Sequence, residues 1–245
     1  MAVSRFNISA AYDLAEAAMT AILAPQDEIY LEDHAGMTSP SFGEKALSPQ
    51  KHTILHAFLE SWEQCRWEEC VSEINPSEDF GLFDRYLGLC DVRKPSWFTP
   101  AEIDNRRDDL YEVLKSAYPK AANAAFQLLF QNREFLLQFH SQVASKIASA
   151  ASLPPNAVRP IPRCAYIPTW LKKGVFYRDR GLCQECGRDV SGTLNLEGEL
   201  HLDHLLPLES GGTNDSSNFQ ILCSGCNWTK GGQVRPAINI NHAFW

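Results

Sequence analysis

Apolar residues recur with helical spacing through the first 152 residues of the chain. After Ser9, a residue type that caps helices, four apolar residues predict one buried helix face: Ala11, Leu14, Ala18 and Ile22. The polar segment Asp27–Ala46, which contains Gly, Pro and Ser, predicts a loop. Ser48-Pro49 favours a helix start, because Pro fits the first helical turn. The helix after it is expected to bury one face: Ile54, Leu55, Phe58, Leu59, Trp62 and Cys65.

Two further helix starts follow in the same region. Residues 99–102 read Thr-Pro-Ala-Glu, a capping-box pattern that predicts a helix from there to about Ala117. Pro119 can open the next helix, whose apolar stripe comprises five residues: Phe126, Leu129, Phe135, Leu136 and Phe139. Residues 1–152 are therefore expected to form an all-α domain.

Proline marks the expected domain boundary. Five prolines lie between Leu153 and Pro168: Pro154, Pro155, Pro160, Pro162 and Pro168. Because proline cannot continue a helix and favours extended chain, residues 153–169 are expected to form a semi-stiff linker. Residues 170–245 would then form a second domain.

The second domain shows a mixed pattern. Residues 170–180 predict a short basic amphipathic helix. Residues 199–204 alternate between polar and apolar types, as in a half-buried strand, and residues 219–222 predict a second strand. Residues 227–232 predict a short helix that ends at glycines. The whole chain is therefore expected to be of the α+β class.

Charge is unevenly distributed along the 245 residues, which carry −8 in total. Residues 155–245 have nine Lys and Arg against eight Asp and Glu, so the rest of the chain carries −9. Because an acidic surface repels phosphates, any nucleic acid is expected to bind the second domain. No run approaches the roughly 20 apolar residues that cross a bilayer, and no secretory signal precedes the first helix. These features indicate a cytoplasmic protein without a membrane partner.

Four of the eight cysteines form two C-x-x-C pairs, Cys183 with Cys186 and Cys223 with Cys226. In a chain without a secretory signal, such pairs indicate metal ligands rather than disulfides. Four thiolates suit tetrahedral Zn²⁺, and a domain of about 75 residues has a small core that benefits from a structural metal. The alternative interpretation is that buried free cysteines fall in pairs by chance.

The insertion between these two pairs carries the candidate chemistry. Asp203-His204 is followed by Pro207, Gly211-Gly212, Asn218, the second cysteine pair, Asn227 and Lys230-Gly231. Asn218 lies fourteen residues after His204, and Asn227 lies nine residues after Asn218. This order and spacing resemble the HNH endonuclease family, with Asn in place of the last His. The resemblance covers residues 170–235 and implies a ββα-metal finger that hydrolyses phosphodiester bonds.

The resemblance implies a role for each of these residues. His204 would be the general base, since imidazole titrates near neutrality, and Asn218 would fix the loop that orients it. Asp203 and Asn227 would hold one Mg²⁺ or Mn²⁺, because oxygen ligands suit these ions. Taken singly, each is also compatible with a turn, a cap or a solvated strand end. In a flat strand Asp203 and His204 face opposite sides, so the chain must bend for both to serve one phosphate.

Basic and aromatic residues near the motif are candidate contacts with nucleic acid. The phosphate contacts are expected among five basic residues: Lys230, Arg178, Arg180, Lys172 and Lys173. On a helix such residues commonly form only a solvated face. Trp228 is expected to pack against the zinc knuckle rather than stack on a base, and His201 to be exposed. Three cysteines of the first domain are expected to be small buried residues: Cys65, Cys70 and Cys90.

Three functions follow from the second domain. The leading one is an HNH endonuclease that cuts DNA, and the family association adds a nickase in a bacterial restriction or phage-defence system. The alternative is a non-catalytic zinc module that binds nucleic acid or protein, which gives no reason for the four candidate site residues to occur together. A nuclease for RNA or single strands is equally compatible with the motif. The acidic helical domain can dock a protein partner, mediate self-association or cover the active site.

Overall fold

The computed structural model describes residues 8–24, 40–149, 160–192 and 200–237. A mostly helical N-terminal region precedes a small two-stranded sheet, which confirms the α+β class. Within these residues, no helix has the length and apolar character needed to span a membrane. Contacts divide the chain into two compact units, which we call unit 1 (Met1–Gln26 and Leu55–Leu129) and unit 2 (Asp27–Ile54 and Phe130–Trp245).

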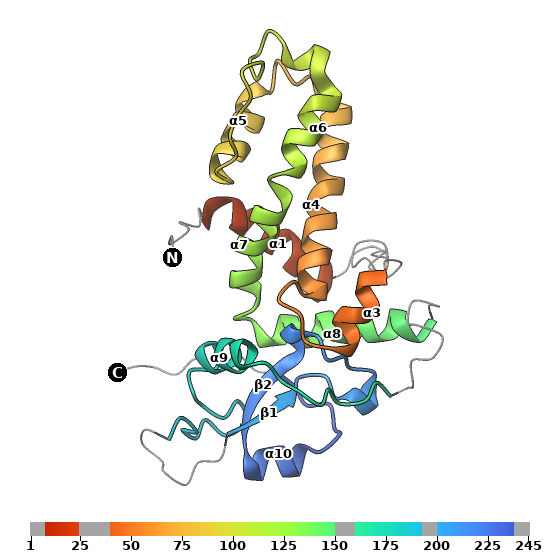
Figure 1. Cartoon of the computed structure of the whole chain (residues 1–245), viewed down its shortest axis with the longest axis vertical. Helices are drawn as coiled ribbons and strands as arrows, with labels where there is room; N and C mark the ends of the chain where they lie inside the picture. Colours follow the sequence, from red (N-terminus) through yellow and green to blue (C-terminus); the bar gives the residue numbers. More distant parts are fainter. Residues whose placement is uncertain (1–7, 25–39, 150–159, 193–199, 238–245) are drawn as a thin grey trace. The chain divides into compact units, whose positions relative to one another are not determined.

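Unit 1 is helical (Figure 1) and comprises α1 (Ile8–Leu23), α4 (Ile54–Glu73), α5 (Phe80–Leu89), the 3-10 helix η1 (Ile103–Arg106), α6 (Arg107–Lys115) and α7 (Tyr118–Leu129). Helix α1 packs along α7, and the four apolar residues predicted for α1 are all buried. Trp67 of α4 lies against Phe83 and Tyr86 of α5, with ring centroids 5.7 and 4.2 Å apart. The helical character predicted for this region is confirmed.

Two predicted helix boundaries are wrong near residue 50. The segment expected to be a loop contains α3 (Pro40–Leu47), which buries Phe42 and Ala46. Helix α4 begins at Ile54, whereas Ser48-Pro49 starts no helix. The N–H of Ile54 donates to the carboxylate of Asp215 at 2.7 Å, so the first turn of α4 is capped by a side chain distant in sequence. Local sequence could not reveal such a cap.

Other boundaries also differ from the prediction. The capping-box residues 99–102 lead into η1, and α6 begins only at Arg107. The apolar stripe expected on one helix is divided between α7 and α8 (Arg133–Ser149). Cys90 is buried and Cys70 half-buried, but Cys65 is exposed, so the prediction that all three are buried was wrong for Cys65.

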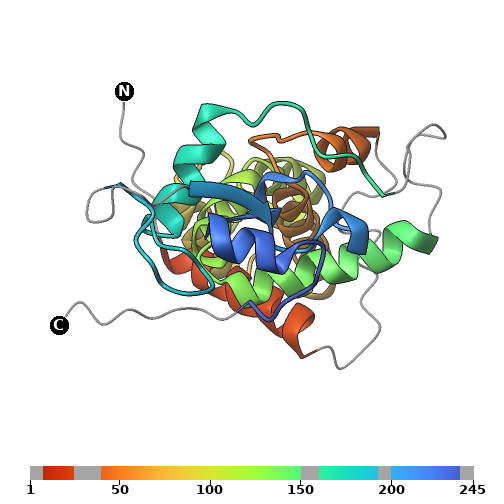
Figure 2. The ribbon, with the colours of Figure 1, turned by 90° about the horizontal axis from the view of Figure 1, so that it is seen from below.

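Unit 2 contains α3, α8 and the sheet, together with α9 (Thr169–Arg178), β1 (Leu200–His204), η2 (Leu208–Ser210), η3 (Ser216–Asn218), β2 (Phe219–Cys223) and α10 (Ser224–Lys230). Strands β1 and β2 are antiparallel, with His204 opposite Phe219. Helix α10 packs on both strands, α9 packs on β2, and α8 packs on η3 (Figure 2). The predicted order of helix, strand, loop, strand and helix is confirmed, although α10 begins three residues before the predicted Asn227.

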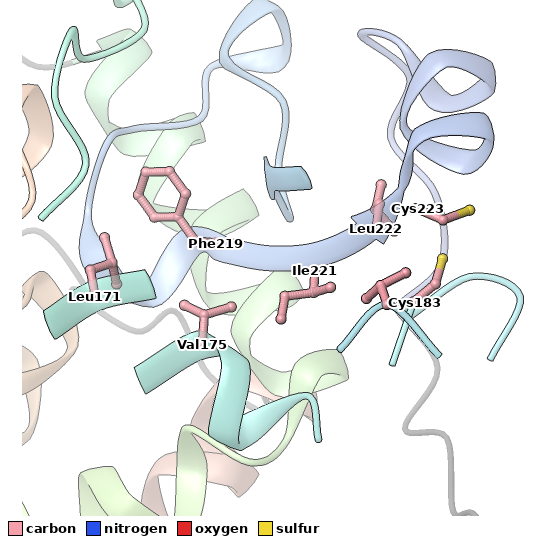
Figure 3. Close-up of a cluster of buried hydrophobic side chains, with 8 residues drawn as sticks. Leu171, Val175, Cys183, Phe219, Ile221, Leu222 and Cys223 are labelled. Atoms are coloured by element: carbon pink, nitrogen blue, oxygen red, sulfur yellow. The ribbon is translucent and has the colours of Figure 1, made fainter. Parts of the chain in front are cut away.

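Apolar residues of α9 and β2 form a buried hydrophobic cluster in unit 2 (Figure 3). Leu171 and Val175 of α9 pack with Phe219 and Ile221 of β2, and the cysteines of the knuckles border the cluster. Burial of each such side chain contributes about 1.5–3 kcal/mol, whereas ordering each residue costs about 1–2 kcal/mol in backbone entropy alone. Burial in a cluster of this size offsets only part of that entropy cost, so a bound metal would add substantially to the stability of the unit.

The compact units do not follow the predicted boundary at residues 153–169. Helices α3 and α8 lie inside the expected helical domain 1–152, yet both belong to unit 2. The reason is the polar segment 213–218, which is buried and needs hydrogen-bond partners. The N–H of Asn214 donates to Ala46 O at 2.8 Å, and Ser217 Oγ lies 3.0 Å from Nε2 of His140 on α8. Segments far upstream thus complete the unit that carries the sheet.

Candidate active site

The four cysteines of the two C-x-x-C pairs come together in unit 2. Their sulfur atoms all lie within 4.8 Å of one another, and Sγ of Cys186 is 3.9 Å from Sγ of Cys223. Zn–S bonds of about 2.3 Å in a tetrahedron place sulfurs roughly 3.8 Å apart, so the spacing fits zinc. The N–H of Gln184 donates to Ile221 O at 3.0 Å and ties the first knuckle to β2. The cluster therefore supports a structural zinc ion.

Replacement of Cys183 by serine is expected to lower zinc binding and unfold unit 2. Structural zinc contributes on the order of 10–16 kcal/mol to folding in finger-like peptides, an amount comparable to the whole stability of a typical domain. Zinc content and circular dichroism measure the effect, with Cys164→Ser as the matched control in the same unit. Full zinc occupancy in Cys183→Ser, equal to that of the control, would show that this cluster is not the zinc site.

The end of β1 holds the two candidate catalytic side chains. Asp203 and His204 are 8% and 3% exposed, and both line one cavity of about 550 Å³ together with Asn227 of α10. The ring of His204 lies 4.4 Å from the ring of Phe219, its partner across the sheet. Although a flat strand would separate Asp203 and His204, both therefore reach the same cavity at the end of β1.

Asn214 determines which nitrogen of His204 carries the proton. Its Oδ1 lies 3.1 Å from His204 Nε2, while its Nδ2 donates to Leu47 O at 3.1 Å and Pro162 O at 2.9 Å. Oδ1 also accepts from the N–H of Cys164 at 3.2 Å. Because both amide hydrogens are donated to carbonyls, the oxygen must face His204, and Nε2 must be the donor. In the neutral ring, Nδ1 then keeps the lone pair that can accept a proton.

The imidazole of His204 is neutral at neutral pH because its pKa is lowered. Burial first, and then the guanidinium of Arg163, lower the pKa to about 4, against the opposing effect of Asp203. A general base must be unprotonated before it can accept a proton, and this imidazole is unprotonated at neutral pH. The geometry and the charge state of His204 therefore suit a general base.

Asp203 is held through one of its two carboxylate oxygens. Oδ2 accepts from Lys230 Nζ at 2.7 Å and from Gln220 Nε2 at 3.1 Å. Gln220 in turn accepts from Arg133 of α8. Neither of these contacts uses Oδ1. A divalent cation held by this oxygen and the side-chain oxygen of Asn227 fits the preference of Mg²⁺ and Mn²⁺ for oxygen ligands.

Asn218 lies behind the cavity and shapes the loop that follows β1. Its Oδ1 accepts from the N–H of Leu206 at 2.9 Å, and its Nδ2 donates to Leu206 O at 3.0 Å and Thr213 O at 2.9 Å. The same loop needs two glycines. Gly211 has a φ of +89°, and a Cβ on Gly212 would lie 2.1 Å from Leu206 O. Asn218 thus closes the loop that carries Asn214 to His204.

The candidate phosphate contacts fall into two groups. Arg178 donates to both carboxylate oxygens of Asp179 and to Phe219 O, and its guanidinium lies 4.7 Å from the ring of Phe130. Lys230 is 2% exposed and also donates to His204 O at 2.8 Å. A contact with nucleic acid would have to break these buried pairs, so both residues serve the fold of the site. The others are exposed but do not line the cavity: Arg180, Lys172 and Lys173.

Four residues of the site were not anticipated from the motif: Asn214, Gln220, Arg133 and Arg163. Asn214 follows the glycine pair in the turn-rich loop, where asparagine is common for local reasons, so its type alone indicated nothing. Gln220 alternates with apolar residues on β2, and Arg133 lies 70 residues before Asp203. His201, expected to be exposed, is half-buried.

The comparison with known families decides what this arrangement is. Residues 183–233 match the family model described as HNH endonuclease. The chain carries an HNH endonuclease domain. This domain spans both cysteine pairs and all four candidate catalytic residues, and it supports a nuclease-type function with nucleic acid as the substrate class. No curated protein and no solved structure matches the chain, so nothing beyond the HNH domain is assigned by similarity.

Proposed function

We propose that the protein is a metal-dependent endonuclease that hydrolyses DNA phosphodiester bonds with His204 as general base. The observation that carries the proposal is the cavity in which Asp203, His204 and Asn227 meet, with His204 neutral and its Nδ1 left to accept a proton. A binding module would not need a base held in one tautomer. The alternative of a non-catalytic zinc module accounts for the cysteines alone.

Each side chain has a separate task in this mechanism. His204 Nδ1 removes a proton from the attacking water, and Asn214 stabilises the resulting imidazolium through Nε2–H. Asp203 and Asn227 would hold Mg²⁺ or Mn²⁺, which when bound stabilises charge on the phosphate and on the leaving 3′ oxygen. Lys230 and Gln220 keep the carboxylate of Asp203 in place. The expected products are 5′-phosphate and 3′-hydroxyl ends.

One such site attacks one phosphodiester bond at a time, so a single chain is expected to nick duplex DNA. Double-strand cutting would require two chains to act on opposite strands, and self-association through the helical N-terminal region would bring them together. The association with bacterial restriction or phage defence stays a prediction. So does the docking of a protein partner on the acidic helices.

The direct test incubates the protein with supercoiled plasmid and Mg²⁺ or Mn²⁺. We expect conversion to open circles that EDTA prevents, with zinc content measured in parallel so that loss of the structural ion is not mistaken for loss of catalysis. Linear product appearing as the first product would indicate paired sites instead of nicking. Folded, zinc-loaded protein that cuts neither plasmid, single-stranded DNA nor RNA with either ion would favour the binding module.

A further inference from the structure

Trp228 and Arg163 both line the catalytic cavity, and neither has a step of its own in the hydrolytic mechanism. Trp228 of α10 is 87% exposed, the highest value among the exposed large hydrophobic residues that the structure describes. Arg163, from the proline-rich segment, is exposed and lines the same cavity. An exposed indole and an exposed guanidinium within one cavity match the two parts of a nucleotide, its base and its phosphate.

Helix α10 explains why Trp228 is exposed. Lys230 turns inward to Asp203, and Cys226 turns toward the zinc cluster. Trp228 lies two residues from each, and side chains two apart on a helix do not share a face. The expectation that Trp228 packs against the zinc knuckle was therefore wrong. The indole is instead presented beside Asn227, its neighbour in the sequence and a proposed metal ligand.

Arg163 supplies the positive charge on this side of the cavity. Its guanidinium donates to Leu202 O, a backbone carbonyl of β1, at 3.3 Å. Leu202 lies two residues before His204 on β1, and Arg163 and His204 both line the cavity. Lys230 also lies near His204, but its charge is neutralised by Asp203. Glu209 also lines the cavity, and its carboxylate repels a phosphate. A phosphate is therefore expected to bind near Arg163 instead.

We propose that this cavity binds a nucleotide whose base is unpaired, with the base stacked on Trp228 and an adjoining phosphate on Arg163. The inference rests on the proposed function in taking the cavity as the site of cleavage, and it names the substrate class. A paired base inside a duplex has both faces covered by its neighbours, so only a single-stranded or locally opened strand can offer a face to the indole. The enzyme therefore acts preferentially on single-stranded nucleic acid, or on a duplex at flaps, loops and breathing ends.

A protein partner is the other conceivable occupant of an exposed tryptophan. The surroundings argue against it, because Trp228 is 87% exposed and the cavity it lines combines apolar residues with Arg163, Asp203 and Asn227. Protein interfaces centre their tryptophans in desolvated apolar pockets. The mixture of an aromatic face, a cation and oxygen ligands fits a nucleotide better.

The test measures binding without cleavage, in buffer that lacks Mg²⁺ and Mn²⁺. Fluorescence anisotropy of a labelled 12-nucleotide single strand is compared with that of the same sequence as a duplex. Because base stacking contributes about 1–3 kcal/mol, Trp228→Ala should weaken single-strand binding about 5- to 150-fold. Trp228→Phe, the matched control, should retain most of it. Arg163→Ala should weaken binding and reduce the salt dependence by about one counterion, whereas Arg163→Lys should not.

The outcomes separate this inference from the proposed function. Unchanged single-strand binding in Trp228→Ala, or an equal loss for single strand and duplex, would overturn the stacking site. Trp228-dependent binding of single strands by a protein that cuts no nucleic acid would leave the nucleotide site standing and refute the nuclease. Cleavage that depends on His204, but not on Trp228 or on whether the substrate is single-stranded, would support the nuclease and refute the nucleotide site. Both residues are exposed, so neither substitution is expected to disturb folding.

Discussion

His204→Ala is expected to slow phosphodiester cleavage about 10²–10⁴-fold, the usual contribution of a general base, while zinc binding is retained. The substitution removes the ring that faces the cavity and leaves the four cysteines untouched. Oδ1 of Asn214 keeps the N–H of Cys164 as a donor, so no buried acceptor is abandoned. Plasmid nicking under single-turnover conditions measures the rate, and metal analysis with circular dichroism reports on the fold.

His201→Ala is the matched control, since His201 lies on the same strand, three residues before His204, and outside the cavity lining. It should cut at close to the wild-type rate. Asn214→Ala should slow cleavage less than His204→Ala, because the imidazole remains but its tautomer is no longer imposed. The double variant should be no slower than His204→Ala alone, since groups that act as one unit are not additive. A folded His204→Ala protein that cuts at the rate of the control would remove His204 from the mechanism.

Deletion of residues 1–152 is expected to abolish the folding of the HNH domain, not to release it. The deletion removes α3, residues 48–54 and α8, all of which belong to unit 2. Asn214 would lose Leu47 O, Asp215 would lose the N–H of Ile54, and Gln220 would lose Arg133. Each buried polar group left without its partner costs about 1–3 kcal/mol, so the combined loss approaches the total stability of a domain.

Zinc content, thermal unfolding and nicking by the fragment 153–245 measure this effect. The matched control deletes residues 1–26 and replaces residues 55–129 by a flexible Gly-Ser linker, which removes unit 1 and keeps unit 2. It should bind zinc and unfold cooperatively. A fragment 153–245 that matches the control in zinc content and cooperative unfolding would show that the upstream segments are dispensable. The control also tests whether the acidic helices restrain the nuclease. If the control cuts faster than the full chain, restraint is supported.

The chemistry of the site was largely readable from the sequence because its signals are local. Two C-x-x-C pairs, Asp203-His204, the glycine pair and Asn227 occur within 51 residues, and the family model covers the same span. The alternation of residues 199–204 predicted β1 from side-chain period alone. Gly211 and Gly212 were noted as part of the motif, and the structure adds the reason, which is a left-handed φ and a close backbone approach.

Helix positions were predicted well only where their starts are local. The apolar stripe of α1 and Pro119 near the start of α7 gave correct assignments. The start of α4 was misplaced because its first N–H is capped by Asp215, 161 residues later in the chain. Arg178 and Lys230 were predicted as phosphate contacts from their charge, whereas tertiary structure surrounds both with buried acceptors.

The sequence alone predicted the class of fold, the four cysteines that cluster and the residues proposed to perform hydrolysis. These features depend on residue types that lie close together in the sequence. Such residues stay near one another however the rest of the chain is arranged. Tertiary contacts alone show that α3 and α8 complete unit 2 and that Asn214 imposes the tautomer of His204. They also show that Trp228 faces the cavity with Arg163. Such pairings join positions 10 to 167 residues apart, and buried polar groups select their partners by position in space rather than by order along the chain.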